Sequence, residues 1–250
     1  MPNDFLPLAI LPAAVRLFPL GDAAIVLEFG DRISPVTHRA IQAVSTYLER
    51  EPFGGLRELV PAFTTLTVYY DPWLVSAAGH PQPYEWVAET VRQLLPAALA
   101  ATVDAATTAV EIPVCYGGVF GPDLATVAAH TNLTPEEVIT LHAAPDYLVH
   151  MIGFAPGFPY LGGLDERLAT PRKAQPRPLV PAGTVGIAGP QTGIYSLPTP
   201  CGWQLIGRTP RRLFNPEWAQ PSLLQAGQHL RFVPISEADY HRQQQHEPTP

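Results

Sequence analysis

The chain has 250 residues, of which 46% are hydrophobic and 15% charged, a composition typical of a globular protein with a substantial core. Its net charge of -7 argues against a dedicated nucleic-acid-binding protein, because phosphate contacts need clustered lysine and arginine. The two cysteines, Cys115 and Cys201, suit a reduced compartment and belong to no metal-spaced cluster. No run reaches the roughly 20 apolar residues of a membrane span, and the opening residues lack the basic region of a signal peptide. We therefore expect a cytoplasmic protein without membrane contact.

Strand and helix patterns alternate in the first hundred residues. Ser34, followed by Pro35 and by apolar residues at helical spacing, predicts an amphipathic helix. Pro96 is expected to shorten a second helix, because an internal proline removes a backbone hydrogen bond. The small residues at 97–109 predict a seam, with a domain boundary near residue 105. The predicted strands are 23–30, 56–61 and 65–72, and the predicted helices are 34–51 and 83–100.

The second half is predicted to be mainly β. A strand at 110–117 and helices at 121–131 and 134–143 come first, the last with a Thr134–Glu137 capping box. Short apolar runs then alternate with glycine and proline turns, which is typical of a barrel or sandwich. These strands are expected at 148–154, 185–189, 193–197, 203–207 and 229–235. We predict an α+β protein with an N-terminal domain at 1–105, a mainly β domain at 106–240 and a flexible tail at 241–250.

The stretch "GFAPGFPYLGG", residues 153–163, holds four glycines and two prolines around three aromatic residues. A helix interior would not tolerate them, so the stretch must be a shaped loop. It is either a buried corner of the barrel or the wall of a pocket or of a contact with a partner chain. A corner would tolerate Tyr160→Phe, whereas a contact through the hydroxyl would not.

Basic residues gather in the second half. The segment between Tyr147 and Pro216 contains seven basic and two acidic residues, whereas the rest of the chain contains eight basic and twenty acidic residues. Guanidinium groups suit carboxylate or phosphate, so the segment indicates an anion site. Solvated surface arginines are the alternative. Lys173 is the only lysine of the chain.

Several common catalytic motifs are missing from the sequence. It contains no phosphate-binding loop of the form G-x-x-x-x-G-K-[ST], no G-x-S-x-G elbow and no H-E-x-x-H. The eight histidines have no ligand spacing, so no metal site is expected. His142 and His150 are interpreted as packed or surface histidines rather than as catalytic residues. The backbone amides of "GIAGPQTG", residues 186–193, are a possible anion-binding nest.

Longer motifs carry a family resemblance. "GFAPGFPYLGGL", "TPR", "VPAGTVGIAGPQTGIY" and "GWQLIGRTP" occur in this order between residues 153 and 210. With "IPVCYGG", "FGPDL" and "GDAAIVLEFGD" upstream, the chain resembles the allophanate hydrolase subunit 1 family over nearly its whole length. The family includes the B subunit of 5-oxoprolinase and the histidine-kinase inhibitor KipI. Two departures stand out: Val119 replaces an acid of the family pattern, which excludes an acid/base role there, and Cys201 replaces a glycine, which we interpret as harmless.

The resemblance implies an N-terminal α+β domain followed by a cyclophilin-like β-barrel. It further implies a subunit of an enzyme that converts 5-oxoproline to L-glutamate with ATP and Mg²⁺. The partners would be the C subunit, an allophanate hydrolase subunit 2 homologue, and the A subunit, of a lactam-utilisation family. The chain alone would be inactive. A histidine-kinase inhibitor and half of a urea-carboxylase-like carboxyltransferase are the alternatives, and the latter would need a biotin carrier on another chain.

Site residues follow from these motifs, although no catalytic residue is assigned. The substrate- or anion-binding candidates are Arg172, Arg177, Arg208, Gln191, Thr192 and Tyr195. The arginines have an alternative role, which is to hold a proline-rich loop in place through its backbone carbonyls. The candidates for a pocket or interface are Phe154, Pro156, Gly157, Phe158, Tyr160, Gly183, Gly189, Gly193 and Trp203.

Overall fold

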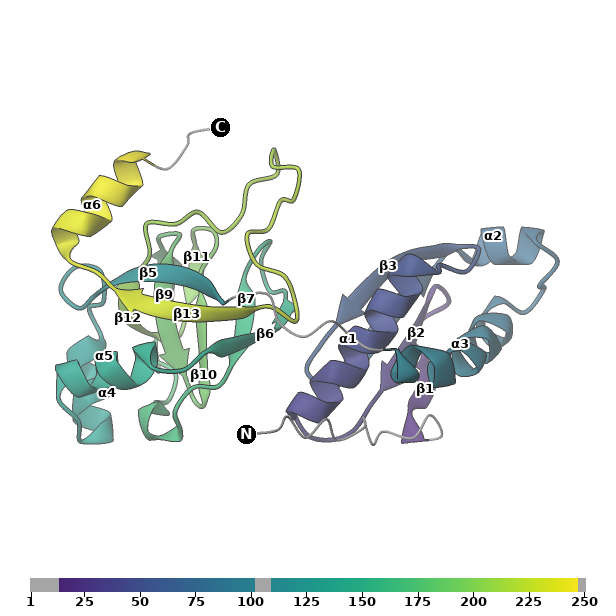
Figure 1. Cartoon of the computed structure of the whole chain (residues 1–250), viewed down its shortest axis with the longest axis horizontal. Helices are drawn as coiled ribbons and strands as arrows, with labels where there is room; N and C mark the ends of the chain where they lie inside the picture. Colours follow the sequence, from purple (N-terminus) through teal and green to yellow (C-terminus); the bar gives the residue numbers. More distant parts are fainter. Residues whose placement is uncertain (1–13, 102–108, 247–250) are drawn as a thin grey trace. The chain divides into compact units, whose positions relative to one another are not determined.

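A computed structural model of the protein describes residues 14–101 and 109–246. The chain forms two compact units, Met1–Ala105 and Ala106–Pro250, coloured purple to blue and teal to yellow in Figure 1. The opening residues in which no signal peptide is expected, and the seam near residue 105, lie outside the described ranges. In those ranges no helix combines the length and apolar character that a membrane crossing requires.

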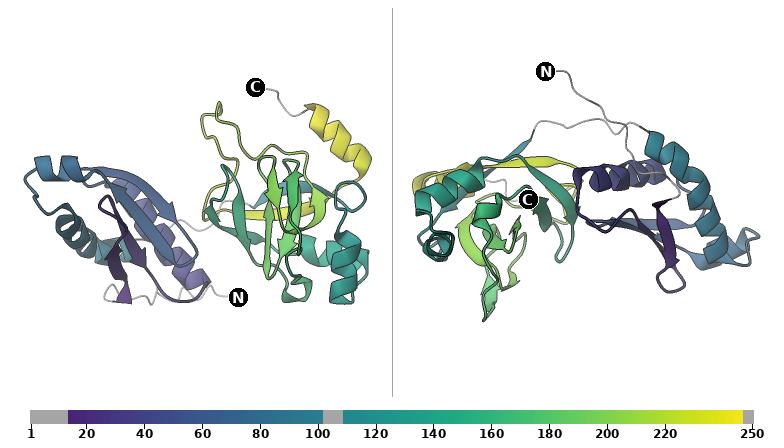
Figure 2. Two further views of the ribbon diagram at one scale, coloured as in Figure 1. Left: turned by 180° about the vertical axis from the view of Figure 1, so that it is seen from behind. Right: turned by 90° about the horizontal axis from the view of Figure 1, so that it is seen from below.

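The first unit is a four-stranded antiparallel sheet with two long helices packed on one face (Figure 2). Alternation along the strands explains the packing, because Ile25 and Leu27 pair in register with Val68 and Leu66 and face the helices together. The sheet order is β1-β2-β4-β3. Its strands are β1 (Arg16–Pro19), β2 (Ala24–Glu28), β3 (Leu56–Pro61) and β4 (Thr65–Tyr70), and the helices are α1 (Pro35–Arg50), α2 (Pro72–Ala77) and α3 (Pro83–Ala100).

Local signals account for most of these elements. Helix α1 begins as predicted, with the Ser34 hydroxyl accepting the Thr37 amide at 3.1 Å. The expected shortening at Pro96 is wrong, because α3 continues to Ala100. Pro96 is exposed, and buried Ala98 and Leu99 hold the last turn against the core. Strand β1 and helix α2 were not predicted.

The second unit is a closed seven-stranded barrel with the order β10-β7-β6-β13-β5-β12-β9 (Figure 1). A separate two-stranded sheet pairs β8 with β11. The α+β class and the barrel predicted from the resemblance are confirmed. The barrel strands are β5 (Val110–Tyr116), β6 (Tyr147–Ile152), β7 (Pro159–Gly162), β9 (Thr184–Ala188), β10 (Gln191–Ile194), β12 (Gln204–Arg208) and β13 (His229–Pro234), and the extra pair is β8 (Arg177–Val180) and β11 (Thr199–Cys201).

Helices cover parts of the barrel. Helices α4 (Leu124–Thr131) and α5 (Pro135–Ala143) lie side by side (Figure 1), and α5 has the predicted capping box. A short 3-10 helix, η2, spans Glu166–Leu168. Contrary to the expected tail from residue 241, helix α6 runs over Glu237–His246. The cause is Ser236, whose hydroxyl accepts the Asp239 amide at 3.1 Å, together with Tyr240, which packs on Phe120. Residues 247–250 of the expected tail are not among those described.

The wall of the barrel has two apolar faces. Residues such as Ile187, Ile194 and Ile206 point into the barrel core, together with Val185 and Leu161. Ala188 and Leu205 on these strands, residues next to the strand ends, and residues of β8 and β11 form a second cluster on the outer face of the wall. We call this second group the outer aromatic cluster, and its buried members are Phe158, Val180, Ala188, Tyr195, Cys201, Trp203 and Leu205. Alternation along β9 and β10 thus serves both faces, whereas the pairing of β12 with β9 shifts register between Leu205 and Gly207.

Candidate functional site

The outer aromatic cluster brings together many of the predicted pocket residues. The Phe158 ring lies at its centre, edge-on to Tyr160, Tyr195 and Trp203 at centroid distances of 5.0, 5.3 and 5.8 Å. These rings come from the loop before β7, from β7 itself, from the end of β10 and from the residue before β12. Edge-to-face packing of this kind is favourable beyond the area it buries. The cluster is therefore a rigid apolar wall on the outside of the barrel.

Gly193 is needed for this packing. A Cβ at residue 193 would lie 2.9 Å from Phe158 Cζ and 3.3 Å from Trp203 Cζ3. The glycine is therefore required because two rings occupy the space of a side chain. It pairs in register with Tyr160, which places both on the outer face of the wall.

Phe154 extends the cluster toward solvent in a strained conformation. Its φ of +66° is in the left-handed region that phenylalanine rarely adopts, and 63% of the residue is exposed. The ring still contacts Phe158 and Tyr195 edge-on, at 5.4 and 6.3 Å. A strained, solvent-facing aromatic residue on a rigid support is typical of functional loops.

The loop that carries Phe154 is fixed to its surroundings. Ser196 Oγ donates to the Pro156 carbonyl at 2.6 Å. Gly157 has φ +75°, and a Cβ there would lie 2.8 Å from Phe214 Cβ. The stretch 153–163 is not a loop throughout, as its glycines and prolines predicted, because Pro159–Gly162 form strand β7 of the barrel. Its first part is a tightly packed corner that supports the exposed Phe154 ring, and a role as the wall of a pocket or of a partner contact stays a prediction.

Polar groups border the cluster around Tyr195. Burial raises the pKa of the Tyr195 phenol, and so does its hydrogen bond with the Cys201 thiol, so the hydroxyl stays protonated at neutral pH. The Arg172 guanidinium acts electrostatically on the same hydroxyl in the opposite direction. Cys201 also accepts the Trp203 amide at 3.2 Å. Tyr195 and Arg172, both predicted to bind substrate, therefore interact electrostatically.

Arg177, the next predicted arginine, is bound to a buried carboxylate. It donates to Asp123 through both terminal nitrogens, at 2.8 and 2.9 Å, and Lys173 Nζ donates to the same carboxylate at 3.1 Å. The Leu205 amide adds a fourth hydrogen bond at 2.8 Å. Burial opposes ionisation of Asp123, but these donors outweigh it and hold its pKa below the ordinary value.

Asp123 thereby anchors the proline-rich segment 171–178. Two backbone links add to the ion pairs: Lys173 N donates to the Gly202 carbonyl at 2.8 Å, and Gln204 Nε2 to the Pro171 carbonyl at 2.9 Å. Arg177 does hold this segment in place, as the alternative interpretation has it, but through a carboxylate and not through backbone carbonyls. It also remains near the cluster, because it acts electrostatically on Cys201.

Thr192 points into the barrel, away from the outer aromatic cluster. Its hydroxyl donates to the Gly186 carbonyl at 3.0 Å and meets His142 Nε2 at 2.9 Å, so it accepts the Nε2 proton. His142 Nδ1 then accepts the Tyr116 hydroxyl at 2.8 Å. Burial lowers the pKa of His142 to about 3, so the imidazole is neutral. This chain of hydrogen bonds lies in the barrel core and agrees with a packing role for His142.

The other predicted residues do not join the cluster. Arg208 lies over the Phe120 ring at 5.9 Å, near helix α6. Gly183 packs against the Thr209 carbonyl, and Gln191 is half-buried at the start of β10. The Gly189 amide donates to the Thr170 carbonyl at 2.7 Å, so this amide of the predicted nest is engaged within the fold.

Sequence reasoning assigned no role to Asp123 or Lys173. The motif "FGPDL" contains Asp123, but an acid at the start of a helix usually indicates a cap. Its partners lie 50 and 54 residues away, so no local pattern reveals the contact. The only available signal was that Lys173 is the single lysine of the chain and lies in the basic segment.

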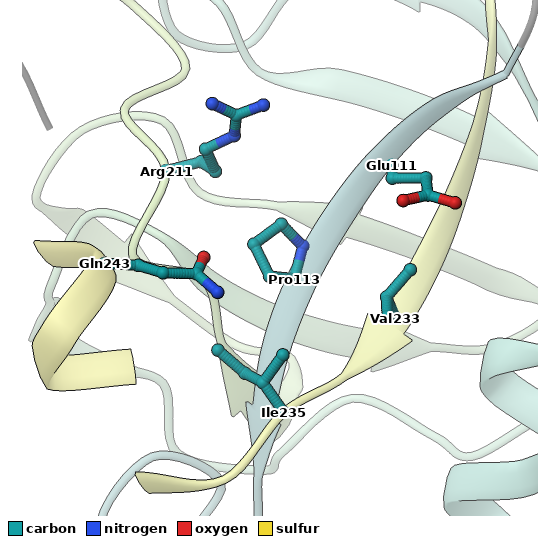
Figure 3. A pocket seen from close by; sticks show the side chains of 6 residues that line it. All are labelled: Glu111, Pro113, Arg211, Val233, Ile235 and Gln243. Atoms are coloured by element: carbon teal, nitrogen blue, oxygen red, sulfur yellow. The ribbon is translucent and has the colours of Figure 1, made fainter. Parts of the chain in front are cut away.

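Two surface hollows contain none of the predicted site residues. One, of about 260 Å³, lies between β5, β13 and α6 (Figure 3). It is lined by Glu111, Pro113, Arg211, Val233, Ile235 and Gln243. Another, of about 530 Å³, surrounds the start of α3 and is lined by Gln82, Pro83, Tyr84 and Glu85. In the described ranges no group of three or more His, Cys, Asp or Glu side chains is arranged to hold a metal ion.

Comparisons with known proteins agree with this architecture. Residues 15–224 match the family described as carboxyltransferase domain, subdomain C and D. The chain is 51% identical to the 5-oxoprolinase B subunit of Bacillus subtilis (strain 168) over 225 residues, which cover 89% of this chain and 93% of the relative. It is 41% identical to the 5-oxoprolinase B subunit of Escherichia coli O157:H7 over 223 residues, which cover 89% and 97% of the two chains.

A solved structure is also similar. The crystal structure of TTHA0988 matches with a TM-score of 0.74 and 36% identity, covering 94% of this chain and 41% of that chain. This chain therefore spans about two fifths of the length of TTHA0988. The family resemblance read from the motifs is confirmed. On the family match and these identities, the chain belongs to the family of the carboxyltransferase domain, subdomain C and D, together with the 5-oxoprolinase B subunits to which it is similar.

Proposed function

We propose that this chain is a subunit of an ATP-dependent 5-oxoprolinase. The reaction would be 5-oxoproline, ATP and two water molecules to L-glutamate, ADP and phosphate. The observation that carries the proposal is the 51% and 41% identity, over about nine tenths of the chain, to proteins named as the B subunit of 5-oxoprolinase. We infer that the chain acts in the cytoplasm, together with homologues of the C subunit and of the A subunit.

The chemistry explains why such a site needs cations and neutral donors. The amide oxygen of a lactam is a poor leaving group until it is phosphorylated. In that step the oxygen forms a bond to the γ-phosphorus, and the bond from the γ-phosphorus to ADP breaks. One water adds to the ring carbon and the C–N bond breaks, so that the nitrogen takes a proton and the carbon becomes an acyl phosphate. A second water attacks this acyl phosphate, its bond to the phosphate group breaks, and glutamate and phosphate are released. Arginine side chains suit the anionic groups of both substrates, since they keep their charge at any physiological pH.

The outer aromatic cluster offers a place for the small ring of 5-oxoproline. Phe154, Phe158 and Tyr160 supply apolar walls. Tyr195 stays protonated and is able to donate to a carbonyl oxygen. We assign substrate binding to this face of the barrel and give no residue of this chain a proton-transfer role.

A partner chain would complete the site. The cluster lies on the outer face of the barrel wall, and Phe154 leaves 63% of its surface exposed. TTHA0988 continues well beyond the part that matches this chain. These two facts support a second chain that closes over the cluster. Mg²⁺ would accompany ATP, held by the phosphates and by residues of either chain.

Co-expression tests the proposal. The chain is purified with candidate homologues of the A and C subunits, and glutamate formed from 5-oxoproline is measured together with ADP. We expect turnover only from the combined chains and negligible turnover from the isolated chain. Full activity of the isolated chain would contradict the dependence on partners. Recovery of a histidine kinase without any barrel-containing partner would favour an inhibitor function.

A carboxyltransferase is the second candidate function. It is favoured by the family description and by 25% identity to a putative urea carboxylase of Emericella nidulans over 138 residues, which cover 51% of this chain and 11% of that protein. Such an activity would need a biotin carrier supplied by another chain. Transfer of labelled carboxylate from a carboxybiotin carrier to urea, with no glutamate formed from 5-oxoproline, would select it.

A further inference from the structure

Two cations share one buried carboxylate at the edge of the outer aromatic cluster. Asp123 is 6% exposed at its side chain, and Lys173 and Arg177 are 27% and 29% exposed. Arg177 binds the carboxylate through both terminal nitrogens, which is the strongest arrangement for this pair. Arg177 alone therefore neutralises Asp123, and Lys173 brings a positive charge in excess.

The position of Lys173 is set by more than its ammonium group. Its backbone amide donates to the Gly202 carbonyl, and the Pro171 carbonyl accepts from Gln204. An ammonium group has three donors, and Asp123 takes one of them in the described part of the chain. The side chain is held in place with donating capacity to spare.

Arg172 adds a third cation on the same border. It acts electrostatically on the Tyr195 hydroxyl, which is hydrogen-bonded to the Cys201 thiol, and Arg177 acts on that thiol. The two arginines therefore both act electrostatically on the neutral pair formed by Tyr195 and Cys201. Three positive charges against one negative charge leave a surplus of two. We call Lys173 and Arg177, which bind Asp123, together with the adjacent residue Arg172 the basic cluster.

We propose that the basic cluster binds a phosphoryl group, with Lys173 as the cation that carries the surplus charge. A carboxylate carries one negative charge and is satisfied by a single guanidinium fork, whereas a phosphoryl group carries close to two and gains from a point charge such as an ammonium. This inference rests on the proposed function and deepens it, because it assigns contacts with the phosphates of ATP to this chain.

Lys173 is the only lysine, so an amine-selective acylating reagent reports on it directly. The full chain is treated with the reagent in the presence of inorganic phosphate, ATP, 5-oxoproline or sodium chloride at matched ionic strength. Mass spectrometry then gives the acylation rates of Lys173 and of the terminal amine, which is the internal control. We expect phosphate and ATP to slow acylation of Lys173 several-fold and to leave the terminal amine unchanged.

Three outcomes would overturn the assignment. Unchanged acylation of Lys173 with phosphate and ATP would show that no phosphoryl group binds there. Equal protection by sodium chloride would reduce the effect to charge screening. Protection by 5-oxoproline without protection by phosphate would assign the cluster to a carboxylate.

A matched pair of variants separates binding from folding. Lys173→Gln removes the surplus charge and leaves the ion pair of Arg177 with Asp123 in place. Arg231→Gln makes the same change of net charge at an exposed pair with Asp146 in the same barrel. We expect K173Q to weaken phosphate binding, measured by calorimetry, at least tenfold with a melting temperature close to that of R231Q, which binds as the wild type does. A lower melting temperature with unchanged phosphate binding would make Lys173 purely structural.

Different results would contradict the phosphoryl site and the 5-oxoprolinase assignment. Phosphate protection of Lys173 in a complex that forms no glutamate would leave the phosphoryl site standing and remove the 5-oxoprolinase assignment. An active complex in which K173Q keeps the wild-type KM for ATP would remove the phosphoryl site and leave the assignment standing.

Discussion

Arg177 and Asp123 form a two-pronged ion pair across 54 residues of sequence, with Nη1–Oδ2 and Nη2–Oδ1 distances of 2.8 and 2.9 Å. The pair joins the proline-rich segment on the outer face of the barrel to the start of helix α4. This ion pair borders the proposed phosphoryl site, and it also holds the segment against the barrel.

Removal of Arg177 should destabilise the barrel. Arg177→Gln leaves the buried carboxylate of Asp123 with one cation, and breaking such a pair costs about 3 kcal/mol. The exposed pair of Arg231 with Asp146 is the control, and Arg231→Gln should cost at most about 1 kcal/mol. Urea unfolding of both variants measures the difference. Equal losses for R177Q and R231Q would contradict a special role for the buried pair.

Thr192 is a core residue in the structure, so its removal should affect folding and not turnover. Thr192→Val leaves the His142 Nε2 proton without an acceptor inside the barrel, at a cost of about 1–3 kcal/mol. Thr140→Val, at an exposed threonine that donates to a helix carbonyl, is the matched control. Activity per folded complex should stay at the wild-type level. A raised KM for 5-oxoproline in T192V would restore the substrate-binding role expected from sequence.

The imidazole of His142 should be neutral well into the acidic range. Burial lowers its pKa to about 3, whereas an unfolded histidine titrates near 6.5. Its contribution to stability is therefore fully present above about pH 6.5 and is lost as pH falls toward 3. Nitrogen NMR at pH 5 should find the proton on Nε2 and none on Nδ1. A doubly protonated ring at pH 5 would contradict the hydrogen-bond chain.

Two variants of Phe154 should separate the cost of its backbone strain from the contribution of its ring to activity. Glycine adopts a φ of +66° without penalty, whereas alanine keeps the strain, so Phe154→Gly should be more stable than Phe154→Ala by about 1 kcal/mol. Both variants lose the exposed ring, so both should lower the activity of the reconstituted complex to the same extent. Thermal unfolding and turnover measure the two effects. Wild-type activity of F154G would leave the ring without a role in catalysis or assembly.

Gly193 should not tolerate a side chain. A methyl group there would lie 2.9 Å from Phe158 Cζ and 3.1 Å from the Pro159 carbonyl, so Gly193→Ala should cost about 1–3 kcal/mol and loosen the cluster. Gly54→Ala is the control, because the space around that position is open. Tryptophan fluorescence from Trp203 and urea unfolding check both variants. Equal stability of G193A and G54A would contradict the packing.

Elements whose signals lie within a few residues could be predicted from sequence. Ser34 and Pro35 marked the start of α1, and Thr134 with Glu137 marked that of α5. Short apolar runs between glycine and proline turns indicated the barrel strands other than β7, which was expected to be part of a loop. These predictions succeeded because capping and alternation are local properties of the chain.

Tertiary contacts decided the rest. Side-chain alternation along a strand predicts that Thr192 and Gly193 lie on opposite faces, but only the closed barrel shows which face is the core. Pro96 stays helical because Ala98 and Leu99 have a core to pack on, and α6 persists because Tyr240 meets Phe120. Asp123 finds Lys173 and Arg177 only after the chain folds, since charges 50 and 54 residues apart carry no local signature of their pairing.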